Sequence, residues 1–381
     1  MHRRKISPTI VTTLVALIAA AAVPSVTAAH PSHGGYVYVN DNTAGTNTVA
    51  AFSHQKNGEL TPVPGSPFTA GGAGTGSGLA SQGAIQVTSD GRYVLAVDAG
   101  SNQVSVLRIK RWGALERVSN GVVPSGGAEP VSIAEHDGLV YVANAAAGRS
   151  NYTGFILTAG GQLRSLAGST VGLPDNAQPG DVLFNSTGTN LVGARVGSSL
   201  IDSFTIGSGG RPTAAPGSPF TAQGPGPFGS EFRPTNPRQL FVANAHGGTD
   251  NGTVSAFSVA ADGTLSSIGP SPFADDQTAP CWVEITHDGQ FLFAVNTGSG
   301  SVSRYSIAPD GDLTLLGSTS VSSTSGVGAV DARLSNDGAT LYVDESRVDA
   351  IGQFAVNGGQ LTGLGSVALP AGAAPAGLAV K

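Results

Sequence analysis

The sequence predicts an all-β protein, a seven-bladed β-propeller, and three observations lead to that prediction. Glycine accounts for 55 of the 381 residues and proline for 23, which gives many turns and little room for long helices. A unit of about 50 residues recurs seven times, the mark of a radial repeat fold. The first unit lacks its leading strand, and the end of the chain offers a spare one.

The most regular element of each unit is an apolar strand that ends in a polar residue. Its residues are largely β-branched or aromatic, as strands favour. Successive copies end 46 to 58 residues apart, a spacing that suits four short strands and their turns. The seven copies are "YVYVN" (to Asn40), "VLAVD" (to Asp98), "VYVAN" (to Asn144), "LVGAR" (to Arg195), "LFVAN" (to Asn244), "LFAVN" (to Asn296) and "LYVDE" (to Glu345).

Three further strands complete each unit. A second apolar series follows the first as "TVAAF", "QVSVL", "YTGFI", "LIDSF", "TVSAF", "SVSRY" and "AIGQF". A glycine turn then leads into a short outer strand, beginning with residues 58, 113, 161, 210, 263, 311 and 359. Ahead of each unit lies an inner strand that often closes with an Asp-Gly turn, as in "WVEITHDG".

The two ends of the chain predict how the ring closes. The first unit has no inner strand, whereas "AGLAV" at residues 376–380 has no unit of its own. A C-terminal strand that completes the first blade would remove the open edges of an unclosed ring. We therefore expect one propeller over residues 36–381, and a monomer.

A repeated motif, "PGSPFTA", occurs at residues 64–70 and 216–222, with a shorter form, "PSPFA", at 270–274. Each copy falls where one blade passes to the next, and its proline and glycine suit a turn. We interpret it as structural, with Phe68, Phe220 and Phe273 filling the gap between blades.

The N-terminal residues predict export. Residues 1–29 combine a basic start, a short apolar core and small residues before Ala28, as a signal peptide does, and residues 30–35 are expected to be flexible. The single cysteine, Cys281, excludes a lipid-attachment cysteine after the signal and any internal disulfide. With no second membrane-length apolar segment, we expect a protein secreted to the medium or cell envelope without a membrane anchor.

The charge of the chain argues against a nucleic-acid partner. The formal net charge is −6, and loss of Arg3, Arg4 and Lys5 with the signal segment would make it −9. The one remaining basic run, "RIKR" at 108–111, is too short for a nucleic-acid surface. Small molecules, glycans or cell-envelope components are the expected partners.

The stretches "LTPVPGSPF", "SDGRYVLAVDAGSNQVSVLRI" and "THDGQFLFAVNTGSGSVSRYSIAPDGDLTLLG" resemble the lactonase family of seven-bladed propellers. That family includes a bacterial type of 6-phosphogluconolactonase and fungal carboxymuconate lactonizing enzymes, and the stretches are also similar to Tyr-Val-Thr-Asn repeat propellers of microbial surfaces. The resemblance covers residues 35–381 and implies the fold. It also implies arginine and histidine side chains in the central channel.

At the positions that the resemblance assigns to those side chains, this sequence has other residues. Phe228 and Gly229 replace an arginine and a histidine, Gly180 replaces a second histidine, and Ala329 and Val330 replace a final Pro-Arg pair. A third such run becomes Trp282, Val283 and Glu284. Opening a lactone needs charge stabilisation and a general base, which glycine and apolar side chains do not supply.

Polar residues do remain on the predicted inner strands. Asp181, Glu231 and Glu284 are candidate catalytic acids, and Glu231 and Glu284 occupy equivalent positions in adjacent blades. Such a pair could bind a divalent cation or be two solvated carboxylates, and no resident cofactor or metal cluster is indicated. Asp331 and Arg333 face the same side of one strand, as an ion pair or as part of a ligand site.

Trp282 could be a stacking platform for a ligand or part of the core, and Cys281 is expected to be a buried, unreactive thiol. Two functional hypotheses follow. The first is a secreted propeller that binds or organises a partner through a channel that has lost the lactonase residues. The alternative is a hydrolase that opens a lactone or cyclic ester with rearranged channel acids.

Overall fold

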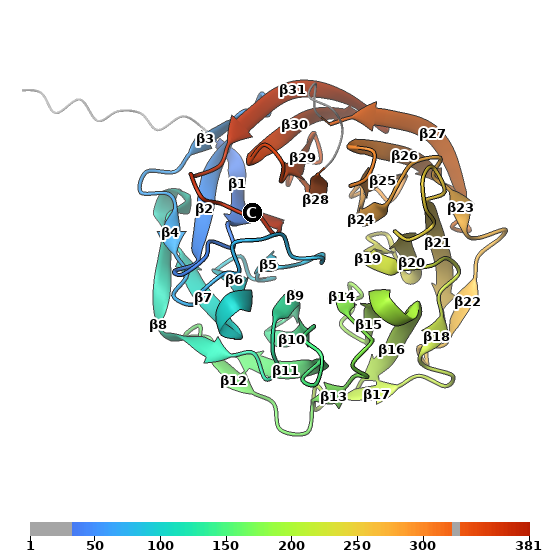
Figure 1. Ribbon diagram of the computed structural model, residues 1–381, viewed down its shortest axis with the longest axis horizontal. Helices are drawn as coiled ribbons and strands as arrows, with labels where there is room; N and C mark the ends of the chain where they lie inside the picture. The colour runs from blue at the N-terminus through green and yellow to red at the C-terminus, as the bar shows by residue number, and fades with distance from the viewer. Residues whose placement is uncertain (1–32, 322–327) are drawn as a thin grey trace, which may run out of the picture. The chain divides into compact units, whose positions relative to one another are not determined.

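The computed structural model describes residues 33–321 and 328–381, which form one compact unit. Seven four-stranded antiparallel sheets stand around a central channel, so the chain is an all-β, seven-bladed propeller (Figure 1). The predicted signal peptide, residues 1–29, lies outside the described residues. No helix in the described ranges is long and apolar enough to span a lipid bilayer.

All four predicted strand series are present. The inner strands, one per blade, are β32 (Leu378–Val380), β5 (Ile85–Val87), β9 (Pro130–His136), β14 (Pro179–Phe184), β19 (Pro227–Arg233), β24 (Pro280–Ile285) and β28 (Ala329–Leu334). The second strands are β1 (His33–Asn40), β6 (Tyr93–Asp98), β10 (Leu139–Asn144), β15 (Asn190–Arg195), β20 (Asn236–Asn244), β25 (Phe291–Asn296) and β29 (Thr340–Glu345).

The outer half of each blade follows the same order. The third strands are β2 (Thr48–Gln55), β7 (Gln103–Ile109), β11 (Asn151–Leu157), β16 (Leu200–Ile206), β21 (Thr253–Val259), β26 (Ser301–Ile307) and β30 (Ala350–Asn357). The outermost are β3 (Leu60–Pro62), β8 (Leu115–Pro124), β12 (Leu163–Ser165), β17 (Pro212–Ala214), β22 (Leu265–Ser267), β27 (Leu313–Ser320) and β31 (Gln360–Ala368). Short 3-10 turns follow at η1 (Ala99–Ser101), η2 (Arg111–Gly113) and η3 (Val196–Ser198).

The C-terminal strand closes the ring as predicted. β32 pairs with β1 in antiparallel register, with Val37 opposite Val380 and Val39 opposite Leu378. Figure 1 shows the C-terminus on the inner side of β1. β1 begins at His33, three residues before the boundary expected from the sequence.

The repeated "PGSPFTA" motif adds a two-residue strand to the third strand of its blade. These strands are β4 (Phe68–Thr69), β18 (Phe220–Thr221) and β23 (Phe273–Ala274), and β13 (Val171–Gly172) holds the same place in the third blade. The serine hydroxyl of each copy accepts a hydrogen bond from that blade's third strand, for example Ser66 from the Ala51 N–H at 2.8 Å. The three phenylalanines pack against clusters that span two adjacent blades, which agrees with the structural interpretation.

Tyrosines on the second strands tie neighbouring blades together. The Tyr93 hydroxyl donates to the Ala159 carbonyl at 2.9 Å, and the Tyr141 hydroxyl donates to the Gly210 carbonyl at 2.7 Å. A Cβ at Gly161, whose φ is +86°, would lie 2.5 Å from the Tyr93 ring. The glycine turn of each unit is therefore needed for close packing as well as for its backbone angle.

The junction that closes the ring contains a buried acid, Asp344. It is fully buried, and neither carboxylate oxygen has a hydrogen-bond partner among the described residues. Burial, followed by the charges of Asp331 and Asp41, raises the pKa of Asp344 well above its ordinary value. The corresponding strand position is Val97 in the second blade and Val295 in the sixth, so an apolar side chain fits this site in the repeat.

We predict that Asp344→Val stabilises the protein at pH 8 by about 1 to 3 kcal/mol, because it removes a buried charge without a partner. A raised folded-state pKa means that the folded state holds more protons, so stability falls as the pH rises from the unfolded value through the folded one. The native protein should thus be more stable at pH 5 than at pH 8, and the variant should show a smaller difference. Urea unfolding at both pH values measures this, with Asp310→Val, at an exposed turn, as the control.

Equal destabilisation of the variant at both pH values would show instead that Asp344 makes a favourable contact at the junction.

Candidate functional site

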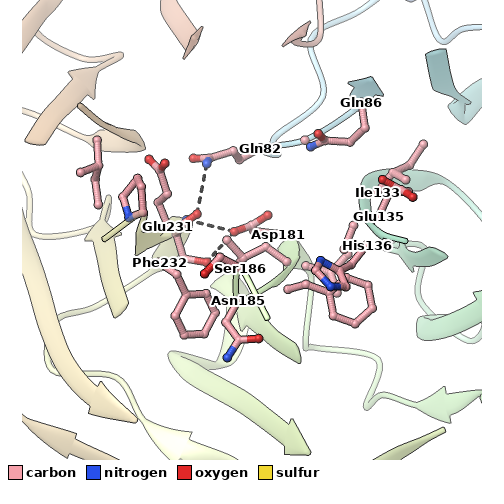
Figure 2. Close-up of a pocket in the computed structure, with 18 of the residues that line it drawn as sticks. Gln82, Gln86, Ile133, Glu135, His136, Asp181, Asn185, Ser186, Glu231 and Phe232 are labelled. Carbon is pink, nitrogen blue, oxygen red and sulfur yellow. Dashed lines mark hydrogen bonds between the residues drawn. The ribbon is translucent and has the colours of Figure 1, made fainter. Parts of the chain in front are cut away.

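A polar hollow lies at the end of the channel where the inner strands finish. It is a cavity of about 410 Å³, lined by residues of β5, β9, β14, β19, β24 and β28 and of the turns that follow them. We call it the acidic cavity, because Glu135, Asp181, Glu231 and Glu284 line it. The described lining contains one guanidinium, that of Arg333. Figure 2 shows Glu231 and His136 on opposite sides of the cavity, with Asp181 between them.

Asp181 is fixed by the blade that follows it. Its Oδ2 accepts hydrogen bonds from the Ser230 N–H at 2.9 Å and the Ser230 hydroxyl at 2.6 Å. The Ser132 hydroxyl donates to its Oδ1 at 3.3 Å. Burial raises the pKa of Asp181 to about 7, and these donors oppose that rise. Asp181 thus holds three adjacent blades together at the wall of the channel.

Glu284 is also tied to its neighbouring blade. Its Oε1 accepts the Leu334 N–H at 2.8 Å, and its Oε2 lies 3.3 Å from the Arg333 guanidinium. Burial raises the pKa of Glu284 to about 7, while Arg333 and the Leu334 N–H act in the opposite direction. Both oxygens of Glu284 therefore have partners, and Arg333 balances its charge.

Arg333 forms the predicted ion pair with Asp331, at 3.3 Å, in addition to its contact with Glu284. Burial alone would lower the pKa of Arg333, but the charges of Asp331 and Glu284 outweigh it and raise the pKa. Asp331 is fully buried and outside the cavity lining. Its Oδ2 accepts the Leu378 N–H of the closing strand at 2.9 Å, so its contacts are structural.

Glu231 differs from the other acids because it keeps a carboxylate oxygen without a partner. Its side chain is partly exposed, and no described residue donates a hydrogen bond to its Oε2. Burial, followed by the charge of Glu284, raises the pKa of Glu231 well above its ordinary value. The predicted approach of Glu231 and Glu284 is thus present, and the charge of Glu284 makes ionisation of Glu231 less favourable.

The opposite end of the channel is closed by residues 79–83, which we call the plug segment. It precedes β5, and Figure 1 shows it reaching from the second blade toward the middle of the ring. The Gln82 N–H donates to the Gly180 carbonyl at 2.9 Å, and the Trp282 indole N–H donates to the Ser81 carbonyl at 2.7 Å. Ser81 is fully buried. The plug segment therefore joins the second blade to the fourth and sixth.

The side chain of Gln82 makes three more bonds across the channel. Its amide donates to the carbonyls of Ser230 at 3.1 Å and Val283 at 3.3 Å, and its oxygen accepts the Val283 N–H at 3.2 Å. A Cβ at Gly229 would lie 2.0 Å from the Gln82 oxygen, so this position must be glycine while the plug segment is in place. Gln82 also lines the acidic cavity, and thus forms its floor.

The plug segment lies against the positions to which the resemblance assigned arginine and histidine. Gly180, Gly229 and Val283 contact Gln82 directly. Phe228 and Trp282 pack edge to face, with ring centroids 5.3 Å apart, in an apolar cluster that includes Ala329 and Cys281. Around Phe228 and Trp282 this end of the channel is a packed apolar core. A separate hollow of about 350 Å³, lined in part by Ala80 and Glu129, lies beside it.

Trp282 and Cys281 are both buried in this apolar cluster. Trp282 is only 3% exposed and lies outside the cavity lining, so the structure favours the second of its two interpretations, part of the core. Cys281 is free and buried, and burial raises the pKa of its thiol to about 11. A thiol of that kind is a poor nucleophile at neutral pH.

Sequence reasoning missed four polar residues of the cavity: Gln82, Gln86, His136 and His287. His136 ends β9, and His287 follows β24 by two residues, so the two histidines hold nearly equivalent places in the repeat. That equivalence was a usable signal. The described residues contain no group of three or more acids, histidines or cysteines arranged to hold a metal ion.

The protein is thus a closed seven-bladed propeller with a polar cavity at one end of its central channel and the packed plug segment at the other. The chain belongs to the lactonase family, since the model of the 7-bladed β-propeller lactonases matches residues 27–155 and 232–379. The unmatched stretch contains Gly180, Asp181, Phe228 and Glu231. Among curated proteins, no sequence matches the chain significantly.

Solved structures of the same fold are similar over nearly their whole length. A putative 6-phosphogluconolactonase of Bacteroides fragilis has a TM-score of 0.72 and 21% identity, over 94% of this chain and 100% of that one. A putative 6-phosphogluconolactonase of Bacteroides uniformis has a TM-score of 0.73 and 19% identity, over 91% and 99%. The periplasmic gluconolactonase of Pseudomonas aeruginosa has 0.70 and 17%, over 91% and 98%. At these identities the likeness concerns the fold alone.

We predict that Gln82→Ala destabilises the protein by about 2 to 4 kcal/mol, because it leaves buried backbone groups in two blades without partners. Gln86→Ala is the matched control, since Gln86 lines the same cavity and its side chain makes no hydrogen bond with the described residues, and it should cost less than about 0.5 kcal/mol. Chemical denaturation of both variants measures the difference. Equal stability of the two variants would contradict the account of the plug segment.

Proposed function

We propose that this lactonase-family propeller binds a small molecule in the acidic cavity and does not open lactones by the mechanism that the family resemblance implies. The plug segment carries this proposal. It occupies the end of the channel where the resemblance placed an arginine and histidines, and it is held by four hydrogen bonds from Gln82 and one from Trp282. The open, polar space is at the other end.

The charge of the cavity supports a ligand other than a phosphorylated sugar lactone. Arg333, the one guanidinium of the described lining, pairs with Glu284 and Asp331. Glu231, Asp181 and Glu135 lie on the same lining. A phosphate brings about two negative charges at neutral pH and would meet this field without a second cation to receive it. Polar neutral or cationic ligands, including glycans and other cell-envelope components, suit the lining better.

Export and a monomeric state are part of the proposal. The support for export is the signal-like segment at residues 1–29, and the Pseudomonas aeruginosa protein of the same fold is described as periplasmic. Ring closure by β32 pairs the inner edge of the first blade within one chain, which supports a monomer.

Expression of the full chain in a bacterial host should place the protein outside the cytoplasm, with a mature N-terminus near residue 29, because residues 1–29 have the composition that signal peptidase processes. N-terminal sequencing of the exported fraction measures this. Retention of Met1 on a cytoplasmic protein would remove this part of the proposal.

The central experiment is a panel of sugar lactones, phosphorylated and plain, offered to the purified protein with and without Ca²⁺ or Mg²⁺. We predict ring opening no faster than the uncatalysed rate in every condition, because glycine and apolar side chains occupy the positions that the resemblance assigns to the arginines and histidines. Saturable binding of unphosphorylated sugars or their derivatives, measured by calorimetry, is expected in the same panel. The control is an unrelated propeller of similar net charge.

One observation favours the alternative, a hydrolase with rearranged acids. Burial and the charge of Glu284 raise the pKa of Glu231, so a carboxyl group with a raised pKa, a carboxylate and a cation face one cavity. If the lactone panel does show turnover, Glu284→Gln should abolish it. Turnover that survives in Glu284→Gln would place the chemistry elsewhere.

A further inference from the structure

We propose that the acidic cavity binds a polar small molecule through a primary ammonium group, with the unpartnered carboxylate oxygen of Glu231 as the counter-charge. This inference rests on the proposed function and names the chemical class of its ligand. Amino sugars and polyamines share this chemistry.

The argument begins with the contacts of the acids. Asp181 and Glu284 accept hydrogen bonds from backbone N–H groups of the next blade, and Glu284 also contacts Arg333. Glu135 accepts the N–H groups of Ser89 at 2.7 Å and Gly138 at 2.8 Å. Of the carboxylates on this lining, Glu231 alone has an oxygen without a partner among the described residues. That oxygen is itself buried, so a turn of this partly exposed side chain would bring it to a donor supplied by a ligand.

The surroundings of the cavity extend the negative field. A second hollow of about 380 Å³ adjoins it and shares Glu135, and it adds Asp90 and Asp137. Its one arginine, Arg92, is already paired with Asp90 at 2.6 Å. Carboxylates therefore outnumber unpaired cations across both hollows, an arrangement that attracts a cation from solution.

The remaining lining residues suit a ligand that has hydroxyl or further amine groups. Gln86 and Ser186 add an amide and a hydroxyl group to the lining, and Phe232 gives it an apolar side. A cavity of about 410 Å³ has room for a monosaccharide or a short polyamine. A hydroxylated or extended amine can thus place its ammonium group at Glu231 while its other polar groups meet these side chains.

Binding of an ammonium group must be linked to protons. Burial and the charge of Glu284 raise the pKa of Glu231 above its ordinary value, and an ammonium group needs the ionised carboxylate, so binding is accompanied by proton release wherever the free side chain is protonated. Affinity should therefore rise between pH 5 and pH 8, with release of a proton. Glu135, Asp181, Glu284, Arg333 and the two rim histidines, His136 and His287, face the same cavity and complete its titratable set.

The test is titration calorimetry of the purified protein with glucosamine and spermidine, beside glucose and N-acetylglucosamine as neutral counterparts, at pH 5, 6, 7 and 8. We expect at least one amine to bind about tenfold or more tightly than the neutral sugars at pH 8, the gain typical of a charge-assisted hydrogen bond. Buffers of different ionisation enthalpy measure the proton released. Preference between glucosamine and spermidine distinguishes the two sources of the ammonium group.

Glu231→Gln should reduce amine affinity to that of the neutral sugars and abolish proton release, because the amide keeps the shape but not the charge. Glu129→Gln removes an exposed charge at the plugged end and should change neither. In His136→Gln/His287→Gln the pH dependence should persist, since we assign it to Glu231. A thermal melt of each variant confirms folding.

Three outcomes overturn the inference and are distinguishable. If neutral sugars bind as tightly as the amines, the ligand class is wrong while the proposed binding function stands. If amines bind but Glu231→Gln binds them equally well, Glu231 is not the counter-charge. If neither amines nor neutral sugars bind at any pH, this inference and the proposed function both fail for these ligands.

Discussion

The structure depends on how the inner edge of each blade is satisfied. An inner strand has a paired neighbour on one side only, and its other N–H groups face the channel, where each needs a partner. In this protein a carboxylate of one blade accepts the hydrogen bond from an N–H group of the next blade. The pairs are Ser230 N–H to Asp181, Leu334 N–H to Glu284 and Leu378 N–H to Asp331. In the plug segment, the amide oxygen of Gln82 accepts the hydrogen bond from the Val283 N–H.

This constraint separates structural acids from a functional one. Asp181, Glu284 and Asp331 are committed to the joints between blades, so they hold the ring together whatever the cavity binds. Glu231 stands in the same repeat series, yet one of its oxygens has no partner among the described residues. The ligand site that we propose therefore lies at the one acid of this series that has an oxygen without a partner. The other acids have their hydrogen bonds, and these hold the walls of the cavity in place.

The ring could be predicted from the sequence because the period of the repeat and the β-branched strands are local signals, as in "YVYVN" and "TVAAF". The approach of Glu231 and Glu284 followed from their equivalent positions. The plug could not be predicted, because residues 71–83 read as a glycine-rich connector. Gln82 finds its partners at Ser230 and Val283, 148 and 201 residues away. The sequence left the role of Trp282 open. Its hydrogen bond to the Ser81 carbonyl, in that same segment, places it in the core.

The most direct measurement of the central claim is a crystal structure of the protein with a bound amine or sugar. Our account predicts a ligand at the end of the channel where the inner strands finish, in contact with Glu231, with the hydrogen bond from Trp282 to Ser81 intact. A ligand lying against Trp282 and Phe228, with residues 79–83 displaced, would contradict it. That result would show that the plug segment is a gate to a binding site, and no longer a fixed part of the core.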